Sequence, residues 1–418
     1  MSAALDLRST DAGAWSIGVP RLLAGLDTHA VLDHGAHLEV HGPQPIVELP
    51  RLVELLTGAG LSGRGGAGFP LAAKLQALHG QRARVIVNGS ESEPASLKDR
   101  TLLRRAPHLV LDGALAVAAA LGTDGVTVAV HDEAAFVAVS RAAAQRPDGR
   151  RVRLARTGGG FVGGEARALV RGLDGGPAVP PGRREHLTSS GTLVANVETF
   201  AQTAILLRRG LRGFTDTGTR DEPGTALVTV GGAVGRPGVV ELPLGTPLGI
   251  LLTAAQAAPA QAVLLGGYHG GWVRPNPDIR LSRAGAAAAG SSFGAGVVLV
   301  VDEATCGLGE LALVSGWLAR ASAKQCGPCR FGLPALAADV AALAAGNPAA
   351  LGAAFGHLHS IDGRGACSHP DGAVRFVSSG LHVLQDEVEL HRHGGCRRPV
   401  VGRLPLTPVT SLTSGGAR

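Results

Sequence analysis

The sequence has few cysteines and few aromatic residues. Its 418 residues include five cysteines, nine phenylalanines, three tryptophans and one tyrosine. So few cysteines exclude a scaffold held together by disulfides, and their odd number favours a reducing compartment in which thiols are free for metal or redox chemistry. Because aromatic side chains are scarce, the core must be built from Leu, Val and Ala, and the 62 glycines must shape much of the backbone.

Basic blocks and long apolar runs are missing as well. The net charge is +6, but the arginines are scattered and lack interleaved aromatic residues, so we expect no nucleic-acid partner. The longest apolar runs, residues 114–121 and 297–301, are too short to cross a membrane, and residues 1–48 show no secretory signal pattern. We therefore expect a cytoplasmic protein, with any peripheral contact at the cytoplasmic face of a membrane made through partners.

Strand and helix patterns divide the chain into five segments. Three β-branched runs, at residues 84–88, 125–130 and 151–156, alternate with helical spacing, which predicts a parallel sheet with ligands at the carboxyl ends of its strands. Short strand candidates between residues 225 and 266 predict a small β-grasp module. The expected organisation is a lead-in (1–48), an α/β domain (49–222), a β-grasp module (223–302), a helical bundle (303–395) and a disordered tail (396–418).

Two glycine-rich loops fall at connections of the predicted sheet. In the first, Gly63–Pro70, clustered glycines let backbone N–H groups approach a phosphate, and Lys74 adds a charge in the helix that follows. The second, Gly158–Glu165, carries one acidic residue that can lie beside a planar cofactor. The first loop is neither a P-loop nor a dinucleotide fingerprint. The simpler alternatives are a flexible surface loop for Gly63–Pro70 and a helix-start carboxylate for Glu165.

Polar residues follow the first predicted strand and open a later helix. The segment Asn88–Arg100 places Asn88, Glu91 and Glu93 where they can hydrogen-bond a flavin's ribityl chain or ring edge, although a capped turn with solvated charges is the alternative. The segment Asn196–Thr199 opens a helix, where Asn most often serves as a cap.

Three cysteines have the spacing of metal ligands. Cys326 and Cys329 form a Cys-Gly-Pro-Cys sequence, and Cys367 follows 38 residues later, which suits an iron–sulfur cluster or a zinc site. The same four residues form the thioredoxin active-site motif, but that motif lies between a strand and a helix, whereas this one lies in a helical region. Unrelated buried cysteines are the remaining alternative.

These five motifs occur in the order and spacing of one family. Over about residues 50–393 the chain resembles the NADH-oxidising flavoprotein subunit of respiratory complex I (its F subunit) and the homologues of that protein in NAD-reducing hydrogenases and formate dehydrogenases. The resemblance implies a Rossmann-like domain that binds FMN, a ubiquitin-like β-grasp module of the soluble-ligand-binding (SLBB) type, and a helical bundle that holds a [4Fe–4S] cluster. It also implies hydride transfer from NAD(P)H to FMN, followed by single-electron transfer through the cluster to a protein acceptor.

The resemblance assigns roles to individual residues. Those expected around FMN and its phosphate are Gly63, Arg64, Gly65, Gly66, Gly68, Lys74, Asn196 and Thr199. Those expected at the flavin and nicotinamide are Phe69, Asn88, Glu91, Glu93, Gly164 and Glu165. Glu91 and Glu165 are the predicted catalytic residues, and Cys326, Cys329 and Cys367 are the predicted cluster ligands.

The cluster motif departs from the family pattern at one position. Ala323 stands where the family has the first cysteine of Cys-x-x-Cys-x-x-Cys, so an ordinary [4Fe–4S] site lacks a ligand. The substitutes considered are Ser322, Cys306, His357, His359 and His369. The other outcomes are a three-thiolate cluster with an open iron, a [3Fe–4S] cluster, or no cluster.

The nucleotide pocket is altered too. Ser90 and Ala166 stand where the family has acidic residues. The family also has aromatic residues that stack on the dinucleotide, but no aromatic residue exists near Ala77 or Gly182 in this chain. Each missing aromatic residue removes ~1 kcal/mol of stacking. These changes favour a stand-alone paralogue that passes electrons to a ferredoxin-like or flavocytochrome acceptor, with a small [2Fe–2S] protein as a further partner. There are two alternatives. One is an electron-transfer or binding protein that does not use NADH, and the other is a zinc- or thiol-based structural protein.

Overall fold

The computed structural model describes residues 13–182 and 186–409, and its first layer is a four-stranded parallel sheet. The strand order is β4-β3-β2-β5, so the predicted parallel α/β architecture is confirmed. The strands are β2 (Arg84–Gly89), β3 (Val126–Val130), β4 (Val152–Arg156) and β5 (Thr192–Asn196). The first three agree with the predicted runs, whereas the sequence pattern missed β5, a short strand that passes directly into a helix at Asn196.

Helices cover both faces of this sheet. Eight of the described helices belong to this part of the chain, and the apolar faces of all of them except α7 join the strands in one core that includes Val87, Leu109 and Phe200. On the opposite face, Ile86 and Val194 pack under Leu169 of α7. The helices are α1 (His34–His41), α2 (Leu49–Gly58), α3 (Leu71–Ala77), α4 (Lys98–Arg105), α5 (Pro107–Ala120), α6 (Glu133–Ala144), α7 (Ala166–Leu173) and α8 (Val197–Thr215).

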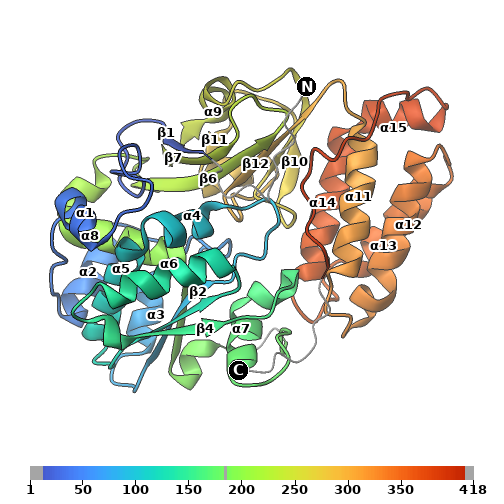
Figure 1. Cartoon of the computed structure of the whole chain (residues 1–418). Helices are drawn as coiled ribbons and strands as arrows, with labels where there is room; N and C mark the ends of the chain where they lie inside the picture. Colours follow the sequence, from blue (N-terminus) through green and yellow to red (C-terminus); the bar gives the residue numbers. More distant parts are fainter. Residues whose placement is uncertain (1–12, 183–185, 410–418) are drawn as a thin grey trace.

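A second, mixed sheet lies above the first in Figure 1. Its order is β1-β7-β6-β12-β9-β10; β6 and β7 form an antiparallel pair, and β12 runs parallel to β6. The strands are β1 (Ala14–Ser16), β6 (Thr225–Gly232), β7 (Gly238–Pro243), β9 (Ala260–Leu265), β10 (Gly271–Val273) and β12 (Val297–Asp302). Beside it lie the two-residue strands β8 (Thr246–Pro247) and β11 (Arg280–Leu281) and helices α9 (Leu248–Ala254) and α10 (Arg283–Ala288).

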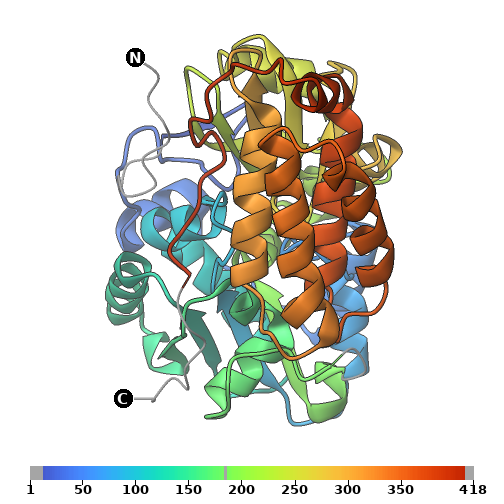
Figure 2. The ribbon, with the colours of Figure 1, turned by 90° about the vertical axis from the view of Figure 1, so that its right-hand side faces the viewer.

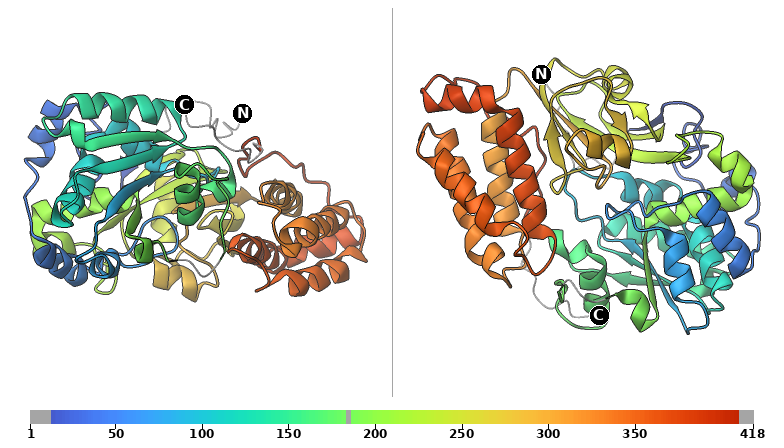
Figure 3. Two further views of the ribbon diagram at one scale, coloured as in Figure 1. Left: turned by 90° about the horizontal axis from the view of Figure 1, so that it is seen from below. Right: turned by 180° about the vertical axis from the view of Figure 1, so that it is seen from behind.

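The remaining helices stand side by side next to the two sheets (Figure 3). They bury an apolar core that includes Leu311, Leu336 and Phe376. They are α11 (Gly307–Arg320), α12 (Leu333–Ala344), α13 (Ala350–Ile361), α14 (His369–Val383) and α15 (Gln385–Arg392), with a π-helical turn at Pro328–Gly332. None of the helices in the described ranges is long and apolar enough to cross a membrane.

The chain after α15 returns along α11, as Figure 2 shows in dark red. The backbone N–H groups of Val401 and Gly402 donate to Glu310 Oε1 at 2.9 and 2.7 Å, and Leu404 is buried. Trp317 Nε1 donates to Thr407 O at 2.7 Å. The expectation of a disordered tail is therefore wrong for residues 396–409, because buried polar groups of the helices hold this segment; residues 410–418 lie outside the described part.

Candidate functional site

The loops after β2 and β4 meet at the carboxyl edge of the parallel sheet. Asn88 Nδ2 donates to Gly164 O at 2.9 Å, and Asn88 Oδ1 accepts from Ser90 N at 3.1 Å. A Cβ atom at Gly164 would overlap Ser92 Oγ and lie 2.7 Å from Ser90 O. A glycine is therefore required at this position for the two loops to approach each other.

A buried charged network joins this edge to the start of α8. Lys98 Nζ lies 2.6 Å from Asp99 Oδ1 and 3.1 Å from Glu198 Oε2, and it donates to Asn196 Oδ1 at 3.2 Å. Burial alone would lower the pKa of Lys98, but Asp99, Glu198 and Glu91 hold it above its usual value. Asn196 is the N-cap of α8, and its Nδ2 donates to Asp99. Asn196, predicted from the sequence to be a helix cap, therefore also makes a contact within the site.

The first glycine loop folds against the same helix start. Arg64 N donates to Thr199 Oγ1 at 2.9 Å, and a Cβ at Gly65 would lie 3.1 Å from Asn196 Cβ. Lys74 Nζ donates to the carbonyl oxygen of Val194, in the middle of β5, at 2.8 Å. The glycine loop predicted to bind FMN therefore lies next to Asn196 and Thr199, the other residues predicted for that site.

Arg283 of α10 is a member of this site that sequence reasoning missed. Its guanidinium lies in the glycine loop, where it donates to Gly63 O at 3.0 Å, and a Cβ at Gly68 would overlap it. In the described part of the chain, the Nε atoms of Arg64 and Arg283 are buried without a hydrogen-bond partner. Burial lowers the pKa of both groups, and their mutual repulsion lowers that of Arg64 further. A buried and a half-buried cation beside a glycine loop fit an anionic group such as the phosphate of FMN.

Glu91 precedes α4 in the chain, and hydrogen bonds hold its carboxylate at the start of that helix. It accepts from Ser96 Oγ at 2.6 Å, Asp99 N at 3.0 Å and Arg100 Nε at 3.0 Å. Burial opposes ionisation, but Arg100 and Lys98 hold the pKa of Glu91 below its usual value. Glu91 is therefore ionised at neutral pH.

The other two predicted acidic residues have different surroundings. Glu93 accepts from Tyr268 N at 2.8 Å, and burial raises its pKa to about 7. It thus joins the parallel-sheet domain to the second sheet. Glu165 is the N-cap of α7, where it accepts from Arg167 N and Ala168 N at 3.1 Å, and it is half-buried.

A cavity of about 640 Å³ borders these loops. Glu91 and Gly159 line it from the parallel-sheet side, Ala323 lines it from the segment that carries the cysteines, and Thr407 lines it from the tail. Phe161 also lines it and packs edge-on against Trp317, with ring centroids 5.1 Å apart. Phe69, by contrast, is 54% exposed and does not line this cavity.

The three predicted cluster cysteines converge between α11 and α14. Burial raises the pKa of Cys329 and of Cys367, and both thiols lie close enough to Cys326 for its negative charge to raise them further. Ser322 hydrogen-bonds Cys329 and donates to Ala319 O at 2.9 Å. Three neighbouring thiols of this kind fit the thiolate ligation of an iron–sulfur cluster.

The other candidates for a fourth ligand have partners elsewhere. His369 lies 3.0 Å from both His269 Nε2 and Leu318 O, so both of its ring nitrogens are engaged. His357 pairs with Asp339 at 2.6 Å, His359 is exposed, and Cys306 lies 3.2 Å from His391 at the other end of α11. Among the substitutes considered, Ser322 is the one whose side chain hydrogen-bonds a cluster cysteine, whereas His369 meets Cys367 through its backbone N–H.

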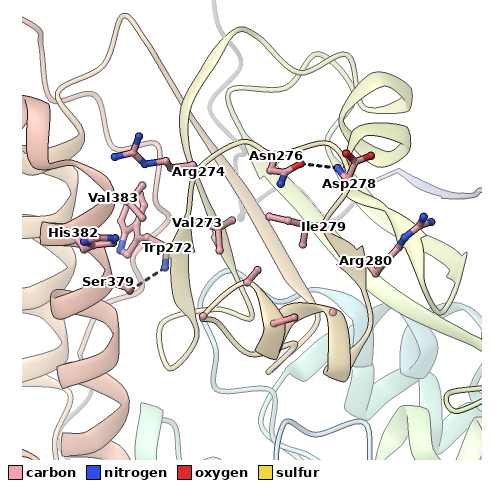
Figure 4. Close-up of a pocket in the computed structure, with 14 residues that line it drawn as sticks. Trp272, Val273, Arg274, Asn276, Asp278, Ile279, Arg280, Ser379, His382 and Val383 are labelled. Carbon is pink, nitrogen blue, oxygen red and sulfur yellow. Dashed lines mark hydrogen bonds between the residues drawn. The ribbon is translucent and has the colours of Figure 1, made fainter.

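A further cavity of about 580 Å³ lies between the second sheet and α14 (Figure 4). Trp272 and His382 line it, and Trp272 N donates to Ser379 Oγ at 3.0 Å, drawn as a dashed line. None of the predicted site residues lines this cavity, so it is separate from the candidate site.

Comparison with known proteins agrees with this geometry. Residues 56–204 match the Nuo51 FMN-binding domain family, and residues 301–391 match the NADH-ubiquinone oxidoreductase-F iron-sulfur binding region. The chain is 30% identical to the F subunit of NADH-quinone oxidoreductase from Streptomyces coelicolor over 377 residues, which covers 82% of this chain and 84% of that protein. It is also 30% identical to the F subunit of the same enzyme from Mycobacterium tuberculosis H37Rv over 378 residues, covering 82% and 85%.

A solved structure has the same fold. The crystal structure of an NAD+-reducing [NiFe]-hydrogenase in the H2-reduced state matches 91% of this chain and 67% of that chain, with a TM-score of 0.78 and 27% identity. The sheet, the glycine loops and the cysteines therefore define an NADH dehydrogenase-like oxidoreductase with FMN-binding and iron–sulfur regions. The chain belongs to the family of NADH-quinone oxidoreductase F subunits, as the sequence resemblance predicted.

Proposed function

We propose that this chain oxidises NAD(P)H at an FMN held by the glycine loop and delivers single electrons through a cluster at Cys326, Cys329 and Cys367. The observation that carries the flavin assignment is the pair formed by the buried Arg64 and the half-buried Arg283, whose Nε atoms are buried beside the loop and have no described partner. When bound, FMN accepts a hydride and gives up its electrons one at a time, and an iron–sulfur cluster carries one electron.

The residues of this chain would supply binding and charge around those groups. Lys74 and the Gly63–Gly68 backbone would hold the phosphate end of FMN, while Asn88, Asn196 and Thr199 offer hydrogen bonds at the sheet edge. Glu91, held ionised beside Arg100, supplies a fixed negative charge at the cavity wall. Such a charge orients a polar substrate without reorganising during the reaction.

The shared cavity supports an electron path between the two sites. Glu91 and Ser92 line it from the loop after β2, and Ser322 and Ala323 line it from the segment just before Cys326. Trp317 and the tail residue Thr407 also line it and are joined by the hydrogen bond from Trp317 Nε1 to Thr407 O. The loop after β2 and the segment just before Cys326 thus line the same cavity.

We assign the second sheet to the β-grasp type of the SLBB family, because it has a hairpin, a helix and a parallel last strand. We assign α11–α15 to the helical bundle that bears the cluster. The expected electron acceptor is a ferredoxin-like or flavocytochrome partner, with a small [2Fe–2S] protein as an additional one. The proposed location is the cytoplasm, or the cytoplasmic face of a membrane through these partners.

Anaerobic absorbance spectroscopy tests this function. Purified protein should release FMN on acid treatment, and its flavin absorbance should bleach on addition of NADH or NADPH. Dithionite should then produce the electron paramagnetic resonance signal of a reduced cluster. Bound FMN that stays oxidised in excess NADH and NADPH would contradict the proposal.

One observation favours a second function. Phe69, the aromatic residue expected to stack on the dinucleotide, is exposed outside the cavity, and the sequence provides no aromatic residue near Gly182. An electron-transfer protein reduced by another protein rather than by NADH is therefore the alternative. It predicts that a reduced ferredoxin bleaches the flavin where NADH does not.

A further inference from the structure

Four side chains of metal-binding type meet at the start of α11, away from the cluster cysteines. Cys306 is the N-cap of α11, Glu387 and His391 lie four residues apart on α15, and Cys396 follows that helix. Their ligand atoms all lie within 4.8 Å of one another. Because α11 has 14 residues and is about 20 Å long, this group and Cys326 lie at opposite ends of it.

The distances within the group are close to those of a tetrahedral site. Cys306 Sγ lies 3.2 Å from His391 Nε2, and Glu387 Oε1 lies 3.8 Å from His391 Nε2 and 3.9 Å from Cys396 Sγ. Zinc bonds of about 2.3 Å to sulfur and about 2.0 Å to nitrogen or oxygen separate tetrahedral ligands by roughly 3.3–3.8 Å. The four ligand atoms, all within 4.8 Å of one another, therefore lie close to these separations, and small shifts bring them to a common ion.

The surroundings hold these ligands in place. Cys306 and Glu387 are each only 3% exposed, and the ring of His391 is also buried. Gly307 N donates to Glu387 Oε2 at 3.1 Å and Leu308 N donates to Oε1 at 3.4 Å, so both carboxylate oxygens are held by the start of α11, and Gly309 N donates to Cys306 Sγ at 3.2 Å. Hydrogen bonds that orient the ligands in this way are typical of protein metal sites.

We propose that Cys306, Glu387, His391 and Cys396 bind one Zn2+ ion. Two sulfur ligands with one imidazole and one carboxylate favour zinc over magnesium or calcium, which prefer oxygen ligands. Two thiolates and a carboxylate around Zn2+ leave one negative charge. Arg398, 3.7 Å from Glu387 Oε2, and the positive end of α11 compensate that charge.

The position of the site gives the ion a structural role. It joins the start of α11 to the end of α15 and to the first residue of the tail segment, and Cys306 N also donates to Pro399 O at 2.9 Å. From there the tail continues along α11 to Thr407, which lines the candidate cavity. Zinc binding would therefore anchor the segment that covers that cavity.

The test is zinc and iron analysis of the full-length protein purified anaerobically. We expect about one zinc per chain, falling about tenfold in His391→Gln and Cys396→Ser, while iron is retained. His393→Gln, which changes an exposed histidine two residues further on, should keep its zinc. Cys326→Ser should lose iron and keep zinc, so failure of the cluster assignment and failure of this proposal are distinguishable.

Three results would overturn the proposal. They are wild-type protein that holds no zinc after incubation with Zn2+ and desalting, zinc that persists in His391→Gln, and a Cys306–Cys396 disulfide in the anaerobic protein. If the variants do not fold, zinc-edge X-ray absorption of the wild-type protein decides instead. The expected shell has sulfur at about 2.3 Å and nitrogen or oxygen at about 2.0 Å, and a shell without sulfur would refute the site.

Discussion

At the scale of single residues, the acidic side chains of one short loop differ because their neighbours differ. Glu91 is surrounded by Arg100, Lys98 and the first N–H groups of α4, which keep it ionised. Glu93, two residues later, has the Tyr268 and Ala95 N–H groups and no cation among its hydrogen-bond partners, so burial raises its pKa to about 7. The sequence alone did not distinguish these two carboxylates, because the difference depends on groups contributed from elsewhere in the fold.

Glu93→Gln should change how stability depends on pH. A carboxyl group whose pKa is raised in the folded state stabilises the fold at low pH, and this contribution is lost as pH rises from about 4.5 to about 7. Since one pKa unit corresponds to about 1.4 kcal/mol, the wild type should lose about 2–3 kcal/mol more than Glu93→Gln between pH 5 and pH 8. Urea unfolding at four pH values measures this, with the exposed Glu39→Gln as the control. Parallel curves for wild type and Glu93→Gln would refute the assignment.

Ala323→Cys should strengthen the proposed cluster site. The substitution restores the family motif next to Ser322, whose hydroxyl is in contact with Cys329. A fourth thiolate ligand should slow the loss of iron in air by about threefold or more. Iron content against time of exposure measures this, with Lys324→Cys as a control that adds a thiol one residue out of register. Equal rates for all three proteins would argue against a cluster that lacks one ligand.

At the scale of elements, the loop Gly63–Gly68 depends on a helix more than two hundred residues further along the chain. Arg283 of α10 enters the loop, and Gly68, with φ of +68°, leaves the space that its guanidinium fills. The predicted strands at residues 84–156 agree with the structure because buried β-branched runs are local signals. Arg283 could not be predicted in the same way, since nothing in its own segment indicates which loop it will meet.

Arg283→Gln should weaken the binding of FMN but not that of riboflavin. Loss of one charge-assisted hydrogen bond costs about 1.5–3 kcal/mol, or roughly 10- to 100-fold in affinity. Riboflavin has no phosphate, so it makes no such bond and its affinity should not change. Fluorescence titration of flavin-free protein with each ligand measures the two affinities. Arg280→Gln, at an exposed arginine on β11, is the matched control. If both flavins weaken equally, Arg283 supports the loop rather than the phosphate.

At the scale of the whole molecule, long-range polar contacts join segments that the sequence pattern treated as separate. Glu241 of β7 accepts from Arg21 N, Leu22 N and Leu23 N at 2.9–3.0 Å, which attaches the lead-in to the second sheet. The tail is held in a similar way by Glu310 and by Tyr268, whose hydroxyl donates to Pro405 O. The composition of the tail, rich in Pro, Thr and Gly, predicted disorder because the sequence does not reveal that Leu404 is buried in the core of α11–α15.

A chain that ends at Arg397 should be less stable and should expose its cavity. It keeps all four proposed zinc ligands but removes the three N–H donors to Glu310, the acceptors of Tyr268 and Trp317, and the buried Leu404. Burial of a leucine contributes about 2 kcal/mol, and each buried polar group left without a partner costs about 1–3 kcal/mol. We expect the free energy of unfolding in urea to fall by at least about 3 kcal/mol and tryptophan fluorescence to shift to longer wavelength. A chain that ends at Val409 keeps every one of these contacts and is the control. Equal stability of the two truncated chains would mean that the tail lies on α11 without supporting it, whereas the expected difference would make residues 398–409 part of the wall that separates the proposed electron path from water.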